Sequence, residues 1–72
     1  MSELKKKINY TVACINEFAK KFEITSKEAF LYLEKYKGIL FLKEHYEIEH
    51  TLSLEDAIED LSRVCRANGG EY

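Results

Sequence analysis

Residues 38–42, which read Gly-Ile-Leu-Phe-Leu, decide the fold of this chain. As a strand, this run of four apolar residues would need a partner, because a lone strand leaves its backbone N–H and C=O groups unpaired. The rest of the sequence offers no second strand-like run. We therefore predict a short helix that is buried on more than one side and ends within residues 43–50, KEHYEIEH.

Two further helices are predicted upstream. Apolar residues recur at steps of three and four from about Glu3 to Phe22, which indicates an amphipathic helix of about five turns. Its predicted core stripe consists of Leu4, Ile8, Val12, Ile15, Ala19 and Phe22, widened by Thr11 and Phe18. Thr25 and Glu28 have the spacing of a capping box, so a second helix should start there and run to about Tyr36. We expect Gly38 to end it in the left-handed conformation.

The last helix is predicted downstream, after residue 53. Ser53 and Asp56 form an N-terminal cap, an apolar stripe follows, and the residues Asn68-Gly69-Gly70 stop the helix. The tail from about residue 69 is expected to be mobile. Residues 1–72 thus form one all-α domain, a compact bundle of about four helices with short connections.

The composition is typical of a folded helical domain and not of a disordered chain. It is 46% hydrophobic and lacks proline, and its net charge of −2 names no partner. The charge is uneven: residues 1–37 carry eight Lys and five Glu, and residues 38–72 carry three basic and eight acidic side chains. We see no signal peptide and no run of the ~18–20 apolar residues that cross a bilayer, and therefore expect a cytoplasmic protein with reduced cysteines.

The stretch KEHYEIEH holds both histidines of the chain, which raises the question of a metal site. Glu47 and His50 share a helix face, as in the Glu-x-x-His motif of di-iron bundles, but such sites need a second copy of that motif and two further Glu residues. A helical wheel instead places His45 within an apolar arc, as a core or interface histidine. We predict no metal and no cofactor, although a metal protein or small enzyme that uses His45 and His50 stays an alternative.

Cysteine catalysis is not predicted either. Cys65 lies in the apolar stripe of the last helix and is expected to be buried, and Cys14 lies at the edge of its stripe. A thiol nucleophile needs a nearby base, and the sequence places neither histidine beside a cysteine. Nucleic-acid binding by the lysines of the first helix remains an alternative, but the third and last helices lack the side chains of a recognition helix.

Two apolar side chains do not fit a single core. Tyr10 points away from the stripe of the first helix, and Leu31 points away from the main face of the second. Such helices are either sandwiched or carry a partner surface. We predict a non-enzymatic protein–protein interaction module that binds a protein partner or a second copy, with no membrane and no small-molecule substrate. The predicted partner surface consists of Tyr10, Leu31, His45, Glu47 and His50.

Three blocks of the sequence carry a family resemblance: ACIxxFAKK from Ala13, TSKEAFxYLxKYxGIxFLxEHYExEHTLS from Thr25, and DAIEDLxxxCRxNGG from Asp56. Together they resemble a family of short bacterial proteins known only as a domain of unknown function. This resemblance implies a small helical protein with no assigned activity or catalytic residues. It also implies a gene neighbour that resembles ADP-ribosyltransferase-type toxins, and hence an antitoxin-like or regulatory role.

Overall fold

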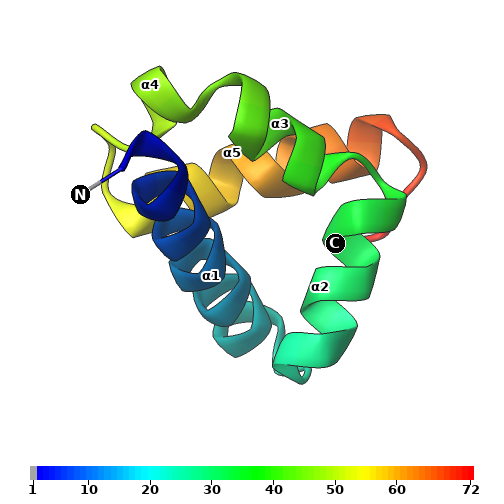
Figure 1. Cartoon of the computed structure of the whole chain (residues 1–72). Coiled ribbons are helices and arrows are strands. Elements are labelled where there is room, and N and C mark those ends of the chain that lie inside the picture. The colour runs from blue at the N-terminus through cyan, green and yellow to red at the C-terminus, as the bar shows by residue number, and fades with distance from the viewer. Residues whose placement is uncertain (1) are drawn as a thin grey trace.

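The computed structural model describes residues 2–72 and confirms the all-α prediction (Figure 1). Its elements, in chain order, are α1 (Glu3–Phe22), α2 (Ser26–Lys35), α3 (Gly38–Glu44), α4 (Tyr46–Glu49) and α5 (Leu54–Ala67). No strand occurs among these residues, and the run at 38–42 is helical as expected. Within the described part of the chain, no helix is both long and apolar enough to cross a bilayer.

The helix starts are fixed by local hydrogen bonds. The Thr25 hydroxyl accepts from the Glu28 N–H and the Glu28 carboxylate accepts from the Thr25 N–H, both at 3.0 Å, so the predicted capping box is confirmed. The hydrogen bond from the Thr25 backbone N–H, and to a lesser extent the contact with the Thr25 hydroxyl, lower the pKa of the exposed Glu28 carboxyl. Ser53 likewise accepts from the Asp56 N–H at 3.1 Å and starts α5. These contacts depend only on nearby residues, which is why the sequence predicts them well.

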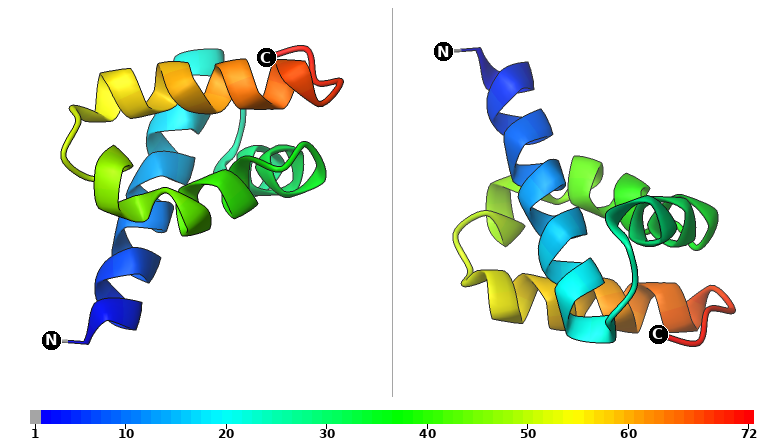
Figure 2. Two further views of the ribbon diagram at one scale, coloured as in Figure 1. Left: turned by 90° about the horizontal axis from the view of Figure 1, so that it is seen from above. Right: turned by 90° about the horizontal axis from the view of Figure 1, so that it is seen from below.

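Helix α1 crosses the other elements instead of lying parallel to them. Figure 2 shows α5 and the α3–α4 segment running side by side, with α1 passing across both. Both views also show the first turns of α1 extending past the remaining helices, on the side away from α5. The C-terminal half of α1 is therefore covered by neighbours, and its N-terminal half has fewer residues to pack against.

The core is built where α1, α2, α3 and α5 meet. Its buried side chains include Cys14, Phe18, Ala19, Ala29, Leu33, Leu42, Ile58, Leu61 and Cys65. On α1, the buried direction thus runs along Cys14 and Phe18, with the partly buried Tyr10 one turn before Cys14. The predicted stripe through Leu4, Ile8 and Val12 does not face the core, and that part of the prediction is wrong.

Gly38 has a role other than the predicted one. The left-handed residue between α2 and α3 is Lys37, with φ of 70°, and Gly38 is the first residue of α3. A Cβ at Gly38 would stand 2.8 Å from Leu33 Cδ2 and 3.1 Å from Cys65 Sγ. The close approach of α3 to these two side chains therefore requires glycine at position 38, and the strained conformation falls on the residue before it.

The third helix ends within KEHYEIEH, as predicted, and the chain breaks at His45 before the single turn of α4. The wheel that placed His45 on an apolar face assumed a continuous helix. His45 lies at the break and is exposed, with its ring centroid 4.9 Å from that of Phe41. The prediction of a core histidine is wrong, and a place in an interface stays a prediction.

The C-terminal tail folds back onto the core. The Tyr72 ring lies 5.0 Å from the rings of both Phe22 and Tyr32. Its backbone N–H donates to the Tyr32 hydroxyl at 2.8 Å, and the Ser62 hydroxyl donates to its carbonyl. The tail is therefore packed in this structure. Its expected mobility stays a prediction.

Candidate functional site

An apolar groove lies between α1, α2 and α3, the three helices at the front of Figure 1. We call it the α1 groove, because most of its lining comes from that helix. Its lining residues are Leu4, Lys7, Ile8, Thr11, Val12, Ile15, Phe30, Ile39 and Lys43. Its volume is about 600 Å³, which is enough for several side chains of a second molecule.

Several apolar side chains of the groove are exposed. Leu4, Ile8 and Val12 expose 69%, 52% and 49% of their surface. They follow one another at steps of four, so they form a continuous ridge on one face of α1. Single exposed apolar residues are common, but a contiguous apolar patch marks an interaction site or a ligand groove.

The charged residues of the groove are both lysines. Lys7 lies on α1 and Lys43 on α3, and no Asp or Glu contributes to the lining. The Lys7 ammonium stands 5.6 Å above the ring centroid of Tyr46, a cation–π contact that holds it at the α4 end. The Thr11 hydroxyl donates to the Lys7 carbonyl at 2.8 Å. The groove is therefore apolar, electropositive and poor in free hydrogen-bonding groups.

A polar cluster lies behind the Lys7 end of the groove, around α4. The Tyr10 hydroxyl donates to the Glu49 carbonyl at 2.9 Å, and the Tyr10 ring meets the Tyr46 ring edge-on. The His50 ring stacks on Tyr46 with centroids 4.5 Å apart. His50 Nδ1 donates to the Tyr46 carbonyl at 2.7 Å, because a carbonyl oxygen can only accept. These contacts join α4 to α1 and hold its single turn in place.

Glu49 is a buried carboxyl in this cluster, with only 4% of its surface exposed. Burial first, and the side-chain contact with Asp60 on α5 second, together raise its pKa to about 7. Asp60 is itself paired with Arg63 at 3.0 Å. Glu49 is therefore protonated below neutral pH. Its Oε1 has no hydrogen-bond partner among the described residues.

The structure scatters the predicted partner surface. Tyr10 is partly buried against α4, and it contacts the same Tyr46 ring that His50 stacks on. His45, Glu47 and His50 are exposed around α4. Leu31 exposes 52% of its surface, but it lies on α2, which Figure 1 places at the other side of the molecule from α4. The five residues do not form one continuous surface.

The cysteines lie in the interior and do not meet a histidine. Cys14 and Cys65 are fully buried, and burial raises the pKa of each thiol to about 11. Such thiols are protonated at neutral pH and are weak nucleophiles. Among residues 2–72, no three His, Cys, Asp or Glu side chains are arranged to hold a metal ion.

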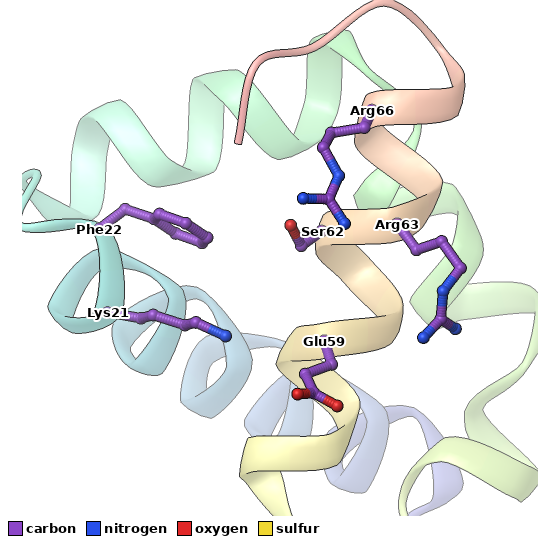
Figure 3. Close-up of a pocket in the computed structure, with 6 residues that line it drawn as sticks. All are labelled: Lys21, Phe22, Glu59, Ser62, Arg63 and Arg66. Carbon is purple, nitrogen blue, oxygen red and sulfur yellow. The ribbon is translucent and has the colours of Figure 1, made fainter.

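A second, polar hollow of about 340 Å³ lies between the end of α1 and α5 (Figure 3). Lys21 and Phe22 border it on one side, and Glu59, Ser62, Arg63 and Arg66 border it on the other. Its cations are exposed side chains, and the Ser62 hydroxyl already donates to the Tyr72 carbonyl. The buried polar side chain of this hollow is thus occupied by the tail and is not free to bind a ligand, so the α1 groove is the better candidate site.

The α1 residues Leu4, Ile8 and Val12 of the groove are predicted from the sequence to lie in the core. Their four-residue spacing is the signal of a buried helix face, and it is also the signal of a docking face. A second signal in the sequence is that Tyr10 and Cys14 lie on another side of the same helix. In the structure the side with Tyr10 and Cys14 is covered and the side with Leu4, Ile8 and Val12 is not.

Comparison with curated proteins found no match, and no solved structure matches this chain. A comparison with known protein families did find one match, over residues 9–68. That family is described as "Protein of unknown function (DUF3791)". The match agrees with the resemblance drawn from the three sequence blocks, and since it spans most of the 72 residues, the chain belongs to the DUF3791 family, a protein family of unknown function.

Proposed function

We propose that this chain is a non-enzymatic protein–protein interaction module that holds an apolar segment of a partner protein in the α1 groove. One observation carries this proposal: the ridge of Leu4, Ile8 and Val12 is exposed along α1, the helix whose first turns extend past the other helices (Figure 2). A chain of 72 residues has little apolar surface to spare. Apolar side chains that are left uncovered in such a chain are best explained by a partner that covers them.

The energetics support this use of the ridge. Full burial of an aliphatic side chain is worth about 1.5–3 kcal/mol, so covering a half-exposed one gains about 1 kcal/mol. The ridge and Phe30 together offer several such gains to a partner. Part of this gain offsets the translational and rotational entropy that the two molecules lose on binding. The remaining free energy corresponds to a specific but moderate affinity.

The chemistry of the groove supports binding over catalysis. Its only charged groups are two lysines, and the lining contains no carboxyl group, thiol or histidine that could act with them in catalysis. Both thiols lie in the core and are protonated at neutral pH. The same apolar lining favours a protein partner over a nucleic acid, whose backbone would need a row of cations. A regulatory role, in which the module restrains the protein that it binds, is part of this proposal.

Site-specific photo-crosslinking in the native host tests the proposal. A photoreactive phenylalanine analogue is placed at Val12 in the groove or at Glu59, an exposed residue of α5. We expect a specific crosslinked protein from position 12 and not from position 59, and its loss in the Ile8→Asp variant. Equal products from the two positions, or no product from position 12, would overturn the proposal. Circular dichroism of each variant confirms that it remains folded.

A further inference from the structure

The lining of the α1 groove also indicates what kind of segment it holds, if the proposed function is correct. We propose that its occupant is an amphipathic helix of another protein, about three to four turns long, whose apolar face is flanked by Asp and Glu side chains. This inference rests on the proposed function and adds the conformation, the length and the charge of the bound segment. Each of the three follows from a different feature of the lining.

The helical conformation follows from the lack of hydrogen-bonding groups. An extended segment would bury its own backbone N–H and C=O groups and would need partners for them along the groove. The lining offers only Thr11 and two lysines, and the Thr11 hydroxyl already donates to the Lys7 carbonyl. A helix satisfies its backbone internally, so it can lie in a groove of this kind with only apolar contacts.

The length follows from the spacing of the ridge. The groove lining extends along α1 from Leu4, the start of the ridge, to Ile15, and the rise of about 1.5 Å per residue makes this part of α1 about 16 Å long. A partner helix of about 11–14 residues covers that distance, with apolar anchors three and four residues apart. The walls formed by Phe30 and Ile39 make the site concave, which suits a helix better than the flat surface of a membrane.

The acidic flanks follow from the charges at the rim. Lys7 on α1 and Lys43 on α3 are the charged lining residues, and no carboxylate neutralises them there. Lys7 is also held in position by the Tyr46 ring, so an acidic partner meets a cation that is already placed. A second copy that offers the same groove would bring four lysines together, so charge disfavours self-pairing.

A binding experiment with two peptides tests the charge and the conformation together. Both fluorescent peptides have about 14 residues with leucines on one helical face. One carries glutamates at the remaining positions and the matched control carries lysines. We expect the acidic peptide to bind about tenfold more tightly, and the preference to shrink as salt rises from about 50 to about 500 mM. Circular dichroism should show that this peptide gains helix on binding.

Charge reversal in the protein sharpens the test. The Lys7→Glu, Lys43→Glu double variant should prefer the basic peptide, and Ile8→Asp should bind neither. Equal binding of both peptides by the unaltered chain, lost in Ile8→Asp, would overturn the acidic partner and leave the proposed function standing. If neither peptide binds, the inference fails, and the crosslinking experiment decides independently whether the proposed function fails with it.

Two other occupants are outcomes of the same series. Anionic lipid vesicles that bind the chain more tightly than the acidic peptide would overturn the inference in favour of a membrane surface. A dimer in light scattering that dissociates in the Ile8→Asp variant would overturn it in favour of a second copy. A monomer that ignores vesicles and binds the acidic peptide is the result that we expect.

Discussion

The two halves of α1 carry similar apolar spacing but have different surroundings. In the C-terminal half, Cys14, Phe18 and Ala19 are buried against α2 and α5. In the N-terminal half, Leu4, Ile8 and Val12 stand exposed beside the groove. The spacing of apolar residues along a helix therefore identifies a face that must be covered, but not whether the chain itself or a partner covers it.

Substitution of Phe18 should break the packed half of α1. Phe18 is fully buried, and its ring lies 4.7 Å from Phe22 and 5.6 Å from Tyr32. We expect Phe18→Ala to lower the free energy of unfolding by about 3–5 kcal/mol, which is much of the stability of a domain of this size. Urea unfolding followed by circular dichroism measures the change.

The matched control for Phe18 is Ile8→Ala on the exposed half of the same helix. Ile8 already exposes about half of its surface, so this substitution should cost less than about 1 kcal/mol. Losses of equal size at positions 8 and 18 would show that the N-terminal ridge is part of the core, and the contrast between the two halves would be lost.

Gly38→Ala tests how tightly the start of α3 packs against Leu33 of α2 and Cys65 of α5. The added methyl group would meet Leu33 Cδ2 at 2.8 Å, so we expect a loss of about 1–3 kcal/mol. The Leu33→Val substitution shortens the side chain that stands in the way. The double variant should therefore lose less free energy of unfolding than the two single variants lose together. If urea unfolding shows that the two losses simply add, the close approach of Gly38 to Leu33 is contradicted.

Glu49 gives the polar cluster around α4 a pH dependence. Its pKa is about 7 in the folded chain, against an ordinary value of 4.5, so the folded state binds more protons than the unfolded state between these values. Stability should then fall as pH rises from about 5 to about 7, by on the order of 2 kcal/mol. Glu49→Gln cannot ionise and should remove this slope, which urea unfolding at pH 5 and pH 8 measures.

Two outcomes separate the role of Glu49 from that of the other acids. The Gln variant should be more stable than the unaltered chain at pH 8 and similar to it at pH 5, because the amide resembles the protonated carboxyl. Parallel pH slopes in both proteins would show that Glu49 is ionised throughout this range. The exposed Glu47 on α4 serves as the control, since Glu47→Gln should leave the slope unchanged.

The tail is expected to give a smaller effect than Phe18, Gly38 or Glu49. The Tyr72 ring packs against Phe22, and the Tyr72 backbone makes two hydrogen bonds, with Ser62 and Tyr32. Tyr72→Ala should lower the free energy of unfolding by about 1 kcal/mol, because aromatic pairs contribute about 0.5–1.5 kcal/mol beyond the area that they bury. No change in urea unfolding would favour the mobile tail that the glycines predict.

The sequence predicts the elements of this fold well and their mutual arrangement poorly. Helix caps depend on residues within one turn, so the local sequence predicts them. The caps at Thr25 and Ser53 and the two ends of α1 are examples. Gly38 is predicted as the left-handed end of the second helix, because the approach of Leu33 and Cys65 from other elements leaves no local signal. His45 is predicted as a core or interface histidine, because the helical wheel does not reveal the break after Glu44.

The candidate site was predicted even less completely. The sequence indicates two apolar sides on α1, but the structure exchanges their predicted roles, since Tyr10 packs against α4 and the ridge of Leu4, Ile8 and Val12 is exposed. Which side of the helix faces inward depends on where α5 crosses it. That crossing is set by tertiary packing and by no residue of α1 alone.

Amide chemical shifts of the isotope-labelled chain, recorded while the acidic helical peptide is added, give the most direct test of an exposed docking face on α1. We predict that the largest changes fall on residues 4–15 of α1 and on Phe30, Ile39 and Lys43, with little change along α5. Spectra that do not respond to the peptide would contradict the acidic helical occupant, and changes centred on α5 or on the hollow beside Phe22 would contradict the α1 groove as the binding site.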